Sequence, residues 1–184
     1  MPSFGSERGD VLYLIVCGAP PARRAVHCVE MLRAGDWEVC SIVTPAALAW
    51  VDVEGLTKAT GHPVRTEFRG PNDTAFAPRG DAVLVAPATF NTINKCAAGI
   101  NDNLALGLIN EALGSPSIPI ALLPWVNGSL NEHPAYQPSL ARLRDAGVHI
   151  IVPSSNDLEA FDQSCLAAGN WLKLAGSDSA PSSS

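Results

Sequence analysis

Charge is scarce in this chain of 184 residues, and aromatic side chains are few. Charged residues make up 16% of the chain, whereas an average soluble domain carries about 25%. Lys and Arg number 12 against 18 Asp and Glu, which gives a net charge of −6 without a basic cluster. This balance excludes the electrostatic footprint of a nucleic-acid-binding protein. A monomer would expose an unusually neutral surface, so we expect a homo-oligomer.

Long hydrophobic runs and paired cysteines are also absent. No apolar run approaches the roughly 20 residues that a membrane span needs, and the run at residues 11–19 follows a polar segment without the basic start of a signal peptide. We therefore expect a cytoplasmic protein without a membrane partner. The five cysteines include no Cys-x-x-Cys pair and the four histidines are scattered, which argues against a disulfide framework and a metal site. We expect reduced cysteines in the core.

What is present is an alternation of short β-branched runs with segments of helical period. Runs that are apolar on both faces, separated by helix-length connections, are typical of a parallel sheet covered on both sides. The sequence predicts an α/β, single-domain, flavodoxin-like or Rossmann-like three-layer fold with a six-stranded parallel sheet. The six strands are expected at residues 11–17, 38–44, 64–68, 82–87, 118–123 and 148–152.

Helices are expected between these strands, at residues 21–34, 45–51, 53–60, 91–98, 102–113, 138–146 and 157–174. Residues 70–80 lack periodicity and predict an irregular loop. The domain is expected to span residues 10–175. Residues 1–9 predict a flexible N-terminus, and the low-complexity residues 176–184 predict a disordered tail.

Ligands of open parallel sheets bind outside the carboxyl ends of the strands, so the residues that follow the strands are candidates for a site. After the first strand, Gly18 permits a tight turn, and the next helix presents backbone N–H groups to an anion. The segment is neither Gly-x-Gly-x-x-Gly nor a Walker loop, and an ordinary βα turn is the alternative. Thr44 ends the second strand directly before a helix, where a hydroxyl caps the helix or binds a phosphate.

The segment after the fourth expected strand is the most informative. It carries more hydrogen-bonding side chains at a helix N-terminus than capping requires, namely Thr89, Asn91, Thr92 and Asn94. The fifth strand is followed by Asn127, for which a turn Asn before a Gly is the plain alternative.

Together these segments resemble the homo-oligomeric flavin-containing cysteine decarboxylases, which include the lantibiotic and linaridin peptidyl-cysteine decarboxylases and the phosphopantothenoylcysteine decarboxylases. The resemblance covers residues 11–152. Residues 87–105 (PATFNTINKCAAGINDNLA) are similar to the family's Pro-Ala-Ser-Ala-Asn-Thr block and its Gly-x-x-Asp-Asn-Leu helix start. Residues 124–134 are similar to the motif Pro-Ala-Met-Asn-x-x-Met-Trp-x-x-Pro, and keep Pro124, Asn127 and Pro134.

The resemblance implies a bound FMN at the strand ends, near an interface of a trimer or dodecamer. It implies a phosphate site at Gly18, Ala19 and Thr44. It also implies contacts to the ring or ribityl chain from Thr89, Phe90, Asn91, Thr92 and Trp125.

The implied substrate is a ribosomal precursor peptide with a C-terminal cysteine, faced by Asn127 and Asn91, with the Asn127 amide on its carboxylate. Oxidation of the cysteine side chain by FMN would give a thioaldehyde. This thioaldehyde accepts the electrons freed as CO2 leaves, which yields an aminoenethiol.

Two departures from the family pattern affect this interpretation. Asp73 stands where the family carries its catalytic His, and His133 or, second, His62 is the candidate to replace it. The flap with a Cys that marks the phosphopantothenoylcysteine branch is not visible, since Cys165 lies in a helical segment. This absence favours the peptide-modifying branch.

The alternatives are a phosphopantothenoylcysteine decarboxylase-like enzyme, an FMN-binding regulatory protein, a flavin reductase or electron-transfer protein, and a flavin prenyltransferase. The prenyltransferases usually open on Gly-Ala-Ser-Gly, which this chain lacks.

Overall fold

The computed structural model describes residues 10–68 and 78–178. The expected flexible N-terminus, most of the expected loop at 70–80 and residues 179–184 of the expected tail lie outside these residues, as does Asp73. The last helix, α7 (Leu158–Asp178), includes residues 176–178, which the low-complexity composition places wrongly in a disordered tail.

Five parallel strands form one sheet in the order β2-β1-β3-β4-β5. They are β1 (Val11–Val16), β2 (Glu38–Val43), β3 (Ala82–Ala88), β4 (Ile120–Pro124) and β5 (His149–Ile150). The chain leaves β1 to one side to form β2 and returns to its other side to form β3. The connections that leave β1 and β3 therefore run in opposite directions from neighbouring strands. Open sheets of this kind bind ligands at the carboxyl ends of two such strands.

The prediction of a sixth strand at residues 64–68 was wrong. This segment meets the sheet through one bridge, in which Arg65 pairs with Ile42 beside β2. The Arg65 N–H donates to the Ser41 carbonyl at 3.2 Å, and the Arg65 carbonyl accepts from the Val43 N–H at 2.8 Å. Pro63 has no N–H to extend the ladder, and Glu67 and Phe68 are exposed. The segment has too little apolar surface in contact with the sheet to pair along its length.

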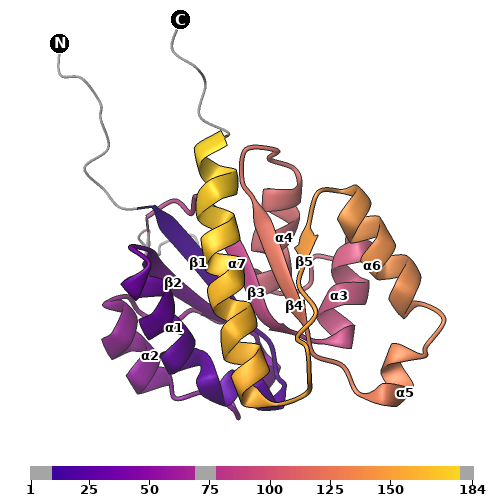
Figure 1. Cartoon of the computed structure of the whole chain (residues 1–184), viewed down its shortest axis with the longest axis horizontal. Coiled ribbons are helices and arrows are strands. Elements are labelled where there is room, and N and C mark those ends of the chain that lie inside the picture. Colours follow the sequence, from indigo (N-terminus) through magenta and orange to yellow (C-terminus); the bar gives the residue numbers. More distant parts are fainter. Residues whose placement is uncertain (1–9, 69–77, 179–184) are drawn as a thin grey trace, which may run out of the picture.

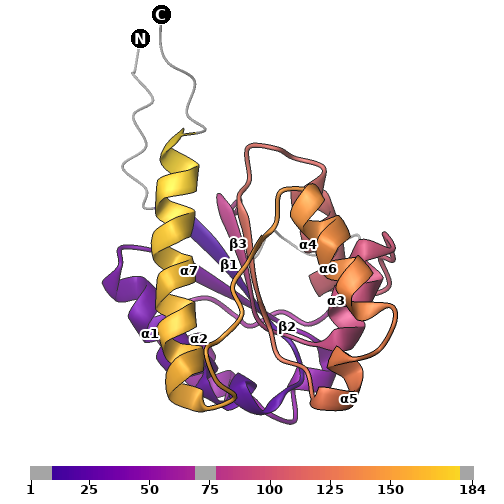
Figure 2. The ribbon, with the colours of Figure 1, turned by 45° about the vertical axis from the view of Figure 1, so that its right-hand side comes forward.

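Helices cover both faces of the sheet, as Figures 1 and 2 show. The helices α1 (Ala25–Ala34), α2 (Val53–Thr60) and α7 cover one face, and α3 (Phe90–Ala97), α4 (Leu104–Leu113) and α6 (Tyr136–Asp145) cover the other. The alternation of side chains along β1 divides the core accordingly. Leu12 and Leu14 pack towards α1 and α7, while Ile15 packs towards the α3 and α4 side.

Short helices occupy the carboxyl edge of the sheet. The chain forms 3-10 turns after β1 (η1, Pro20–Arg24) and after β2 (η2, Pro45–Ala47), so the helix expected at 45–51 is a single turn. A four-residue helix that was not expected, α5 (Gly128–Asn131), follows β4.

All five cysteines are buried, which confirms that they are core residues, and none of them is paired with another. Within residues 10–68 and 78–178, no helix combines the length and apolar character needed to cross a membrane. The same residues contain no cluster of His, Cys, Asp and Glu suited to a metal ion.

Candidate functional site

An open cleft of about 680 Å³ lies at the carboxyl edge of the sheet. Its lining comes from the segments that follow all strands except β2. The lining residues are Gly18, Ala19, Pro20, Thr89, Phe90, Asn91, Trp125, Val126, Asn127, Leu130 and Asn156. None of these side chains carries a charge, so the cleft offers apolar surface with neutral hydrogen-bonding groups. Its volume falls in the usual range for small-molecule sites, about 300–1,000 Å³.

The turn after β1 is held against the turn after β2. A Cβ atom on Gly18 would lie 2.8 Å from the backbone oxygen of Ala46, so glycine is required here by close approach of the two loops. The Thr44 N–H donates to the Val16 carbonyl at 3.0 Å. The Thr44 side chain is buried, and it does not cap η2. Simple helix capping therefore does not explain this hydroxyl, although Thr44 is not part of the cleft lining.

Thr89 and Thr92 have different environments at the start of α3. Thr89 caps the helix, since its hydroxyl accepts from the Thr92 N–H at 3.4 Å, and it also lines the cleft. Thr92 is buried, and its hydroxyl lies 3.2 Å from the Thr89 hydroxyl and 3.3 Å from the Cys17 sulfur. Burial raises the pKa of the Cys17 thiol, which therefore stays neutral. Thr92 thus belongs to an internal polar group beneath the cleft.

Phe90 forms an aromatic wall of the cleft with two partners outside it. Its ring makes an edge contact with His133 at 5.2 Å between centroids and stacks on Tyr136 at 6.1 Å. The His133 Nδ1 accepts from the Ala135 N–H at 3.1 Å, so a neutral His133 ring carries its proton on Nε2. His133 therefore contacts the Phe90 ring and does not itself line the cleft.

Asn127 begins α5 and is oriented by it. Its side-chain oxygen accepts from the Leu130 N–H at 3.0 Å. The amide NH2 group makes no hydrogen bond to the described residues, and the residue is exposed at the cleft. The side chain therefore offers a donor to the cleft. Asn91, in the first turn of α3, is likewise exposed there.

Trp125 supplies the largest ring in the lining. Its backbone N–H donates to the Ala88 carbonyl at 2.8 Å, which joins the end of β4 to the end of β3. Its ring contacts the Phe161 ring of α7 edge-on, with 5.9 Å between the ring centroids. The cleft is also lined by four residues that were not among the expected site residues, namely Pro20, Val126, Leu130 and Asn156. Asn156 lies in the connection between β5 and α7, and only the position of that connection after a strand could have indicated it.

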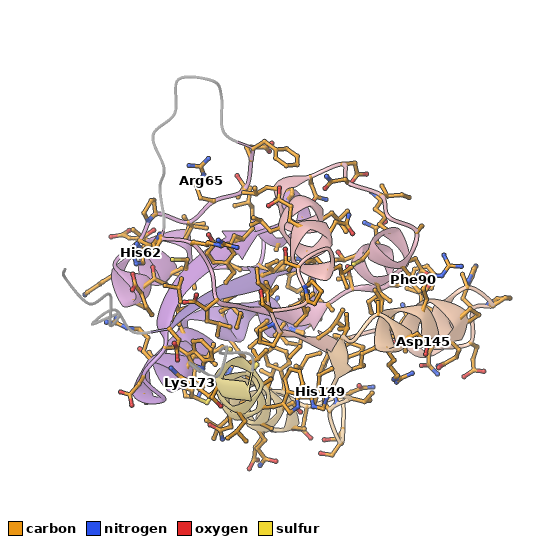
Figure 3. The ribbon with its side chains drawn as sticks, turned by 90° about the horizontal axis from the view of Figure 1, so that it is seen from above. His62, Arg65, Phe90, Asp145, His149 and Lys173 are labelled. Atoms are coloured by element: carbon orange, nitrogen blue, oxygen red, sulfur yellow. The ribbon has the colours of Figure 1, made fainter. Side chains whose placement is uncertain are left out.

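Of the expected site residues, Gly18, Ala19, Thr89, Phe90, Asn91, Trp125 and Asn127 share the cleft, whereas Thr44, Thr92 and His133 lie around it. His62 lies elsewhere: its Nε2 is 3.0 Å from a carboxylate oxygen of Glu38, the first residue of β2 and thus at the amino edge of the sheet. Figure 3 shows His62 and Phe90 on opposite sides of the molecule. His62 therefore does not replace a base at the cleft.

Comparison with known proteins identifies relatives over most of the chain. The chain is 32% identical over 148 residues to the coenzyme A biosynthesis bifunctional protein CoaBC of Thermococcus kodakarensis, covering 76% of this chain and 36% of the relative. It is 36% identical over 123 residues to a cysteine/cysteine sulfinic acid decarboxylase from an unknown prokaryotic organism, covering 64% of this chain and 31% of the relative. The chain thus spans about a third of the length of these relatives.

Among solved structures, the epidermin biosynthesis protein EpiD from Staphylococcus aureus superposes with a TM-score of 0.67 at 25% identity, over 82% of this chain and 89% of that one. The model of the Flavoprotein family matches residues 4–174. The chain belongs to the Flavoprotein family.

Proposed function

We propose that this protein binds FMN and uses it to decarboxylate oxidatively the C-terminal cysteine of a peptide, which yields an aminoenethiol. The observation that carries the proposal is the position of Asn127, which lines the same cleft as Asn91 and Trp125 and whose amide NH2 makes no hydrogen bond to the described residues. Membership of the Flavoprotein family and the cysteine decarboxylase among the relatives support it.

The residues of the cleft fit a flavin. Trp125 and Phe90 offer flat apolar surface for an aromatic ring system, and Thr89 and Asn91 offer neutral hydrogen-bonding groups for its polar edge. The N–H groups of Gly18 and Ala46 make no hydrogen bond to the described residues, which suits a phosphate beside the Thr44 hydroxyl. When bound, FMN would supply the two-electron oxidation of the cysteine side chain.

The chain's own residues would bind and orient the substrate. The Asn127 NH2 group donates to the substrate carboxylate, and Asn91 lies at the same cleft to hold the rest of the cysteine. Neutral amides suit a leaving carboxylate, because a strong ion pair would stabilise the ground state more than the transition state. His133, with its proton on Nε2, is the candidate proton carrier.

Mass spectrometry on short peptides that end in Cys tests this proposal directly. The expected product has lost CO2 and two hydrogens from the C-terminal residue, and the same peptides ending in Ser should remain intact. Protein that binds FMN but leaves every Cys-ending peptide unchanged would contradict the decarboxylase proposal and favour a regulatory or electron-transfer role.

A second candidate is a decarboxylase of coenzyme A biosynthesis, favoured by the relation to CoaBC. The same assay with phosphopantothenoylcysteine separates the two candidates. Turnover of this small substrate with no turnover of peptides would assign the protein to the second.

We also propose a homo-oligomer, a trimer or a dodecamer, in which a neighbouring subunit covers part of the open cleft. The low charge of the chain supports this assembly. Light scattering measures it, and a stable monomer with full FMN occupancy would contradict it.

A further inference from the structure

The phosphate of FMN is a dianion, whereas the chain has a net charge of −6 and a cleft without charged side chains. Neutral donors alone, the backbone N–H groups and the Thr44 hydroxyl, would have to offset this repulsion. A cation close to the turns after β1 and β2 would assist, provided that no carboxylate already neutralises it.

Of the two cations in η1, one already has a carboxylate partner. Arg24 forms an ion pair with Asp162 of α7. The two neighbouring arginines in η1 differ in this respect. Arg23 is exposed and has no carboxylate partner among the described residues.

The Arg23 guanidinium lies over the ring of Trp50, 5.1 Å from its centroid. Such a contact orients a guanidinium without neutralising its charge. Arg23 is in the turn that begins at the cleft-lining Pro20, and Trp50 follows η2. The Arg23–Trp50 contact therefore bridges the same two loops that meet at Gly18 and Ala46.

We propose that Arg23, positioned by Trp50, is the cation that recognises the phosphate of the bound flavin. This inference rests on the proposed FMN site. It adds an electrostatic component to a site whose other contacts are neutral, and it makes the protein select FMN over riboflavin, which has the same ring system and no phosphate.

The test compares dissociation constants for FMN and riboflavin by quenching of flavin fluorescence. Arg23→Gln should weaken FMN binding by on the order of tenfold, as expected for loss of a charge-assisted contact that is partly solvated. Riboflavin binding should stay within twofold of the wild-type value. Arg23→Lys keeps the charge and should retain most of the FMN preference.

Arg33→Gln is the matched control, because it removes the same charge from an exposed residue near the end of α1 whose partner is the Ala59 carbonyl. It should leave both affinities unchanged. Raising the salt concentration should weaken FMN binding to the wild type more than to Arg23→Gln.

The outcomes separate this inference from the proposed function. Equal affinities of wild type and Arg23→Gln for FMN, or parallel losses for FMN and riboflavin, would overturn the role of Arg23 and leave the flavin site standing. Wild-type protein that binds neither flavin would overturn the flavin site itself.

Discussion

The side-chain oxygen of Asn127 accepts the backbone N–H of Leu130 at 3.0 Å, so one hydrogen bond both begins α5 and sets the direction of the amide. The side-chain oxygen caps α5, and the NH2 group of this cleft-lining residue makes no hydrogen bond to the described residues. A residue that reads as a plain turn Asn in the sequence is therefore a helix cap and a candidate substrate ligand at once.

Asn127→Asp tests this double role. Aspartate caps a helix as well as asparagine does, so the fold should be retained. Its carboxylate would lie against that of the substrate, and two like charges about 4 Å apart near a protein surface repel each other by about 4 kcal/mol. We expect turnover to be abolished in the mass-spectrometric assay with FMN still bound.

Asn127→Ser is the companion variant, since serine keeps a capping oxygen and adds no charge. It should lose only the donor to the carboxylate, about 1.5–3 kcal/mol or roughly 10- to 150-fold in kcat/KM. Near-normal turnover in both variants would show that Asn127 is only a cap.

The Thr44 hydroxyl is buried without capping η2, and the proposed phosphate site uses it. Thr44→Ala should therefore weaken FMN binding by about 1–2 kcal/mol, or roughly 5- to 30-fold, measured by flavin fluorescence. Thr44→Ser retains the hydroxyl and should bind FMN nearly as the wild type does. Unchanged FMN affinity in Thr44→Ala would remove this residue from the phosphate site.

Thr92 is expected to act on stability more than on flavin binding. Its hydroxyl lies in the interior beside Cys17 and Thr89, so Thr92→Val leaves the buried Cys17 thiol without this partner. The cost should be about 1–2 kcal/mol. A domain of this size should then melt several degrees lower, since each kcal/mol shifts Tm by roughly 2–4 °C. A large loss of FMN affinity with unchanged Tm would instead place Thr92 at the cofactor.

Two buried thiols predict a loss of stability at alkaline pH. Burial raises the pKa of Cys40 and of Cys96 to about 12 from an ordinary value of 9.0. Between these values the unfolded chain releases protons that the folded chain keeps, so the free energy of unfolding should fall as the pH rises through this window. The limit is about 1.4 kcal/mol per pH unit for each thiol.

Urea unfolding at pH 8 and pH 10 measures this effect. Cys96→Ala should reduce the difference between the two pH values, although the protein is less stable at both. An equal difference in wild type and variant would show that other groups cause the alkaline loss.

The amino-acid sequence alone predicts the fold class and most of the residues that line the cleft. Runs apolar on both faces predict a parallel sheet with two covering layers, and β3 and β4 are buried along both sides of their pleat. The same logic put Gly18, Thr89, Asn91, Trp125 and Asn127 after strand ends, and parallel strands bring their carboxyl ends to one edge. The family resemblance rests on these same segments.

Which of these residues share the cleft depends on contacts between distant segments, which appear in the folded chain alone. Thr89 and Thr92 are alike in sequence, but one helical turn directs Thr92 into the core beside Cys17 and leaves Thr89 at the surface of the cleft. Residues 64–68 have the composition of a strand, yet they pair with the sheet at Arg65 alone. The segment lies at the edge of the sheet and follows Pro63, which has no N–H to donate to a neighbouring strand. Arg23 and Arg24 are adjacent and chemically identical. Asp162 of α7 forms an ion pair with Arg24, whereas Arg23 has no carboxylate partner among the described residues. Local pattern specifies which side chains reach an edge of the sheet, whereas their partners come from distant segments that only the folded chain brings together.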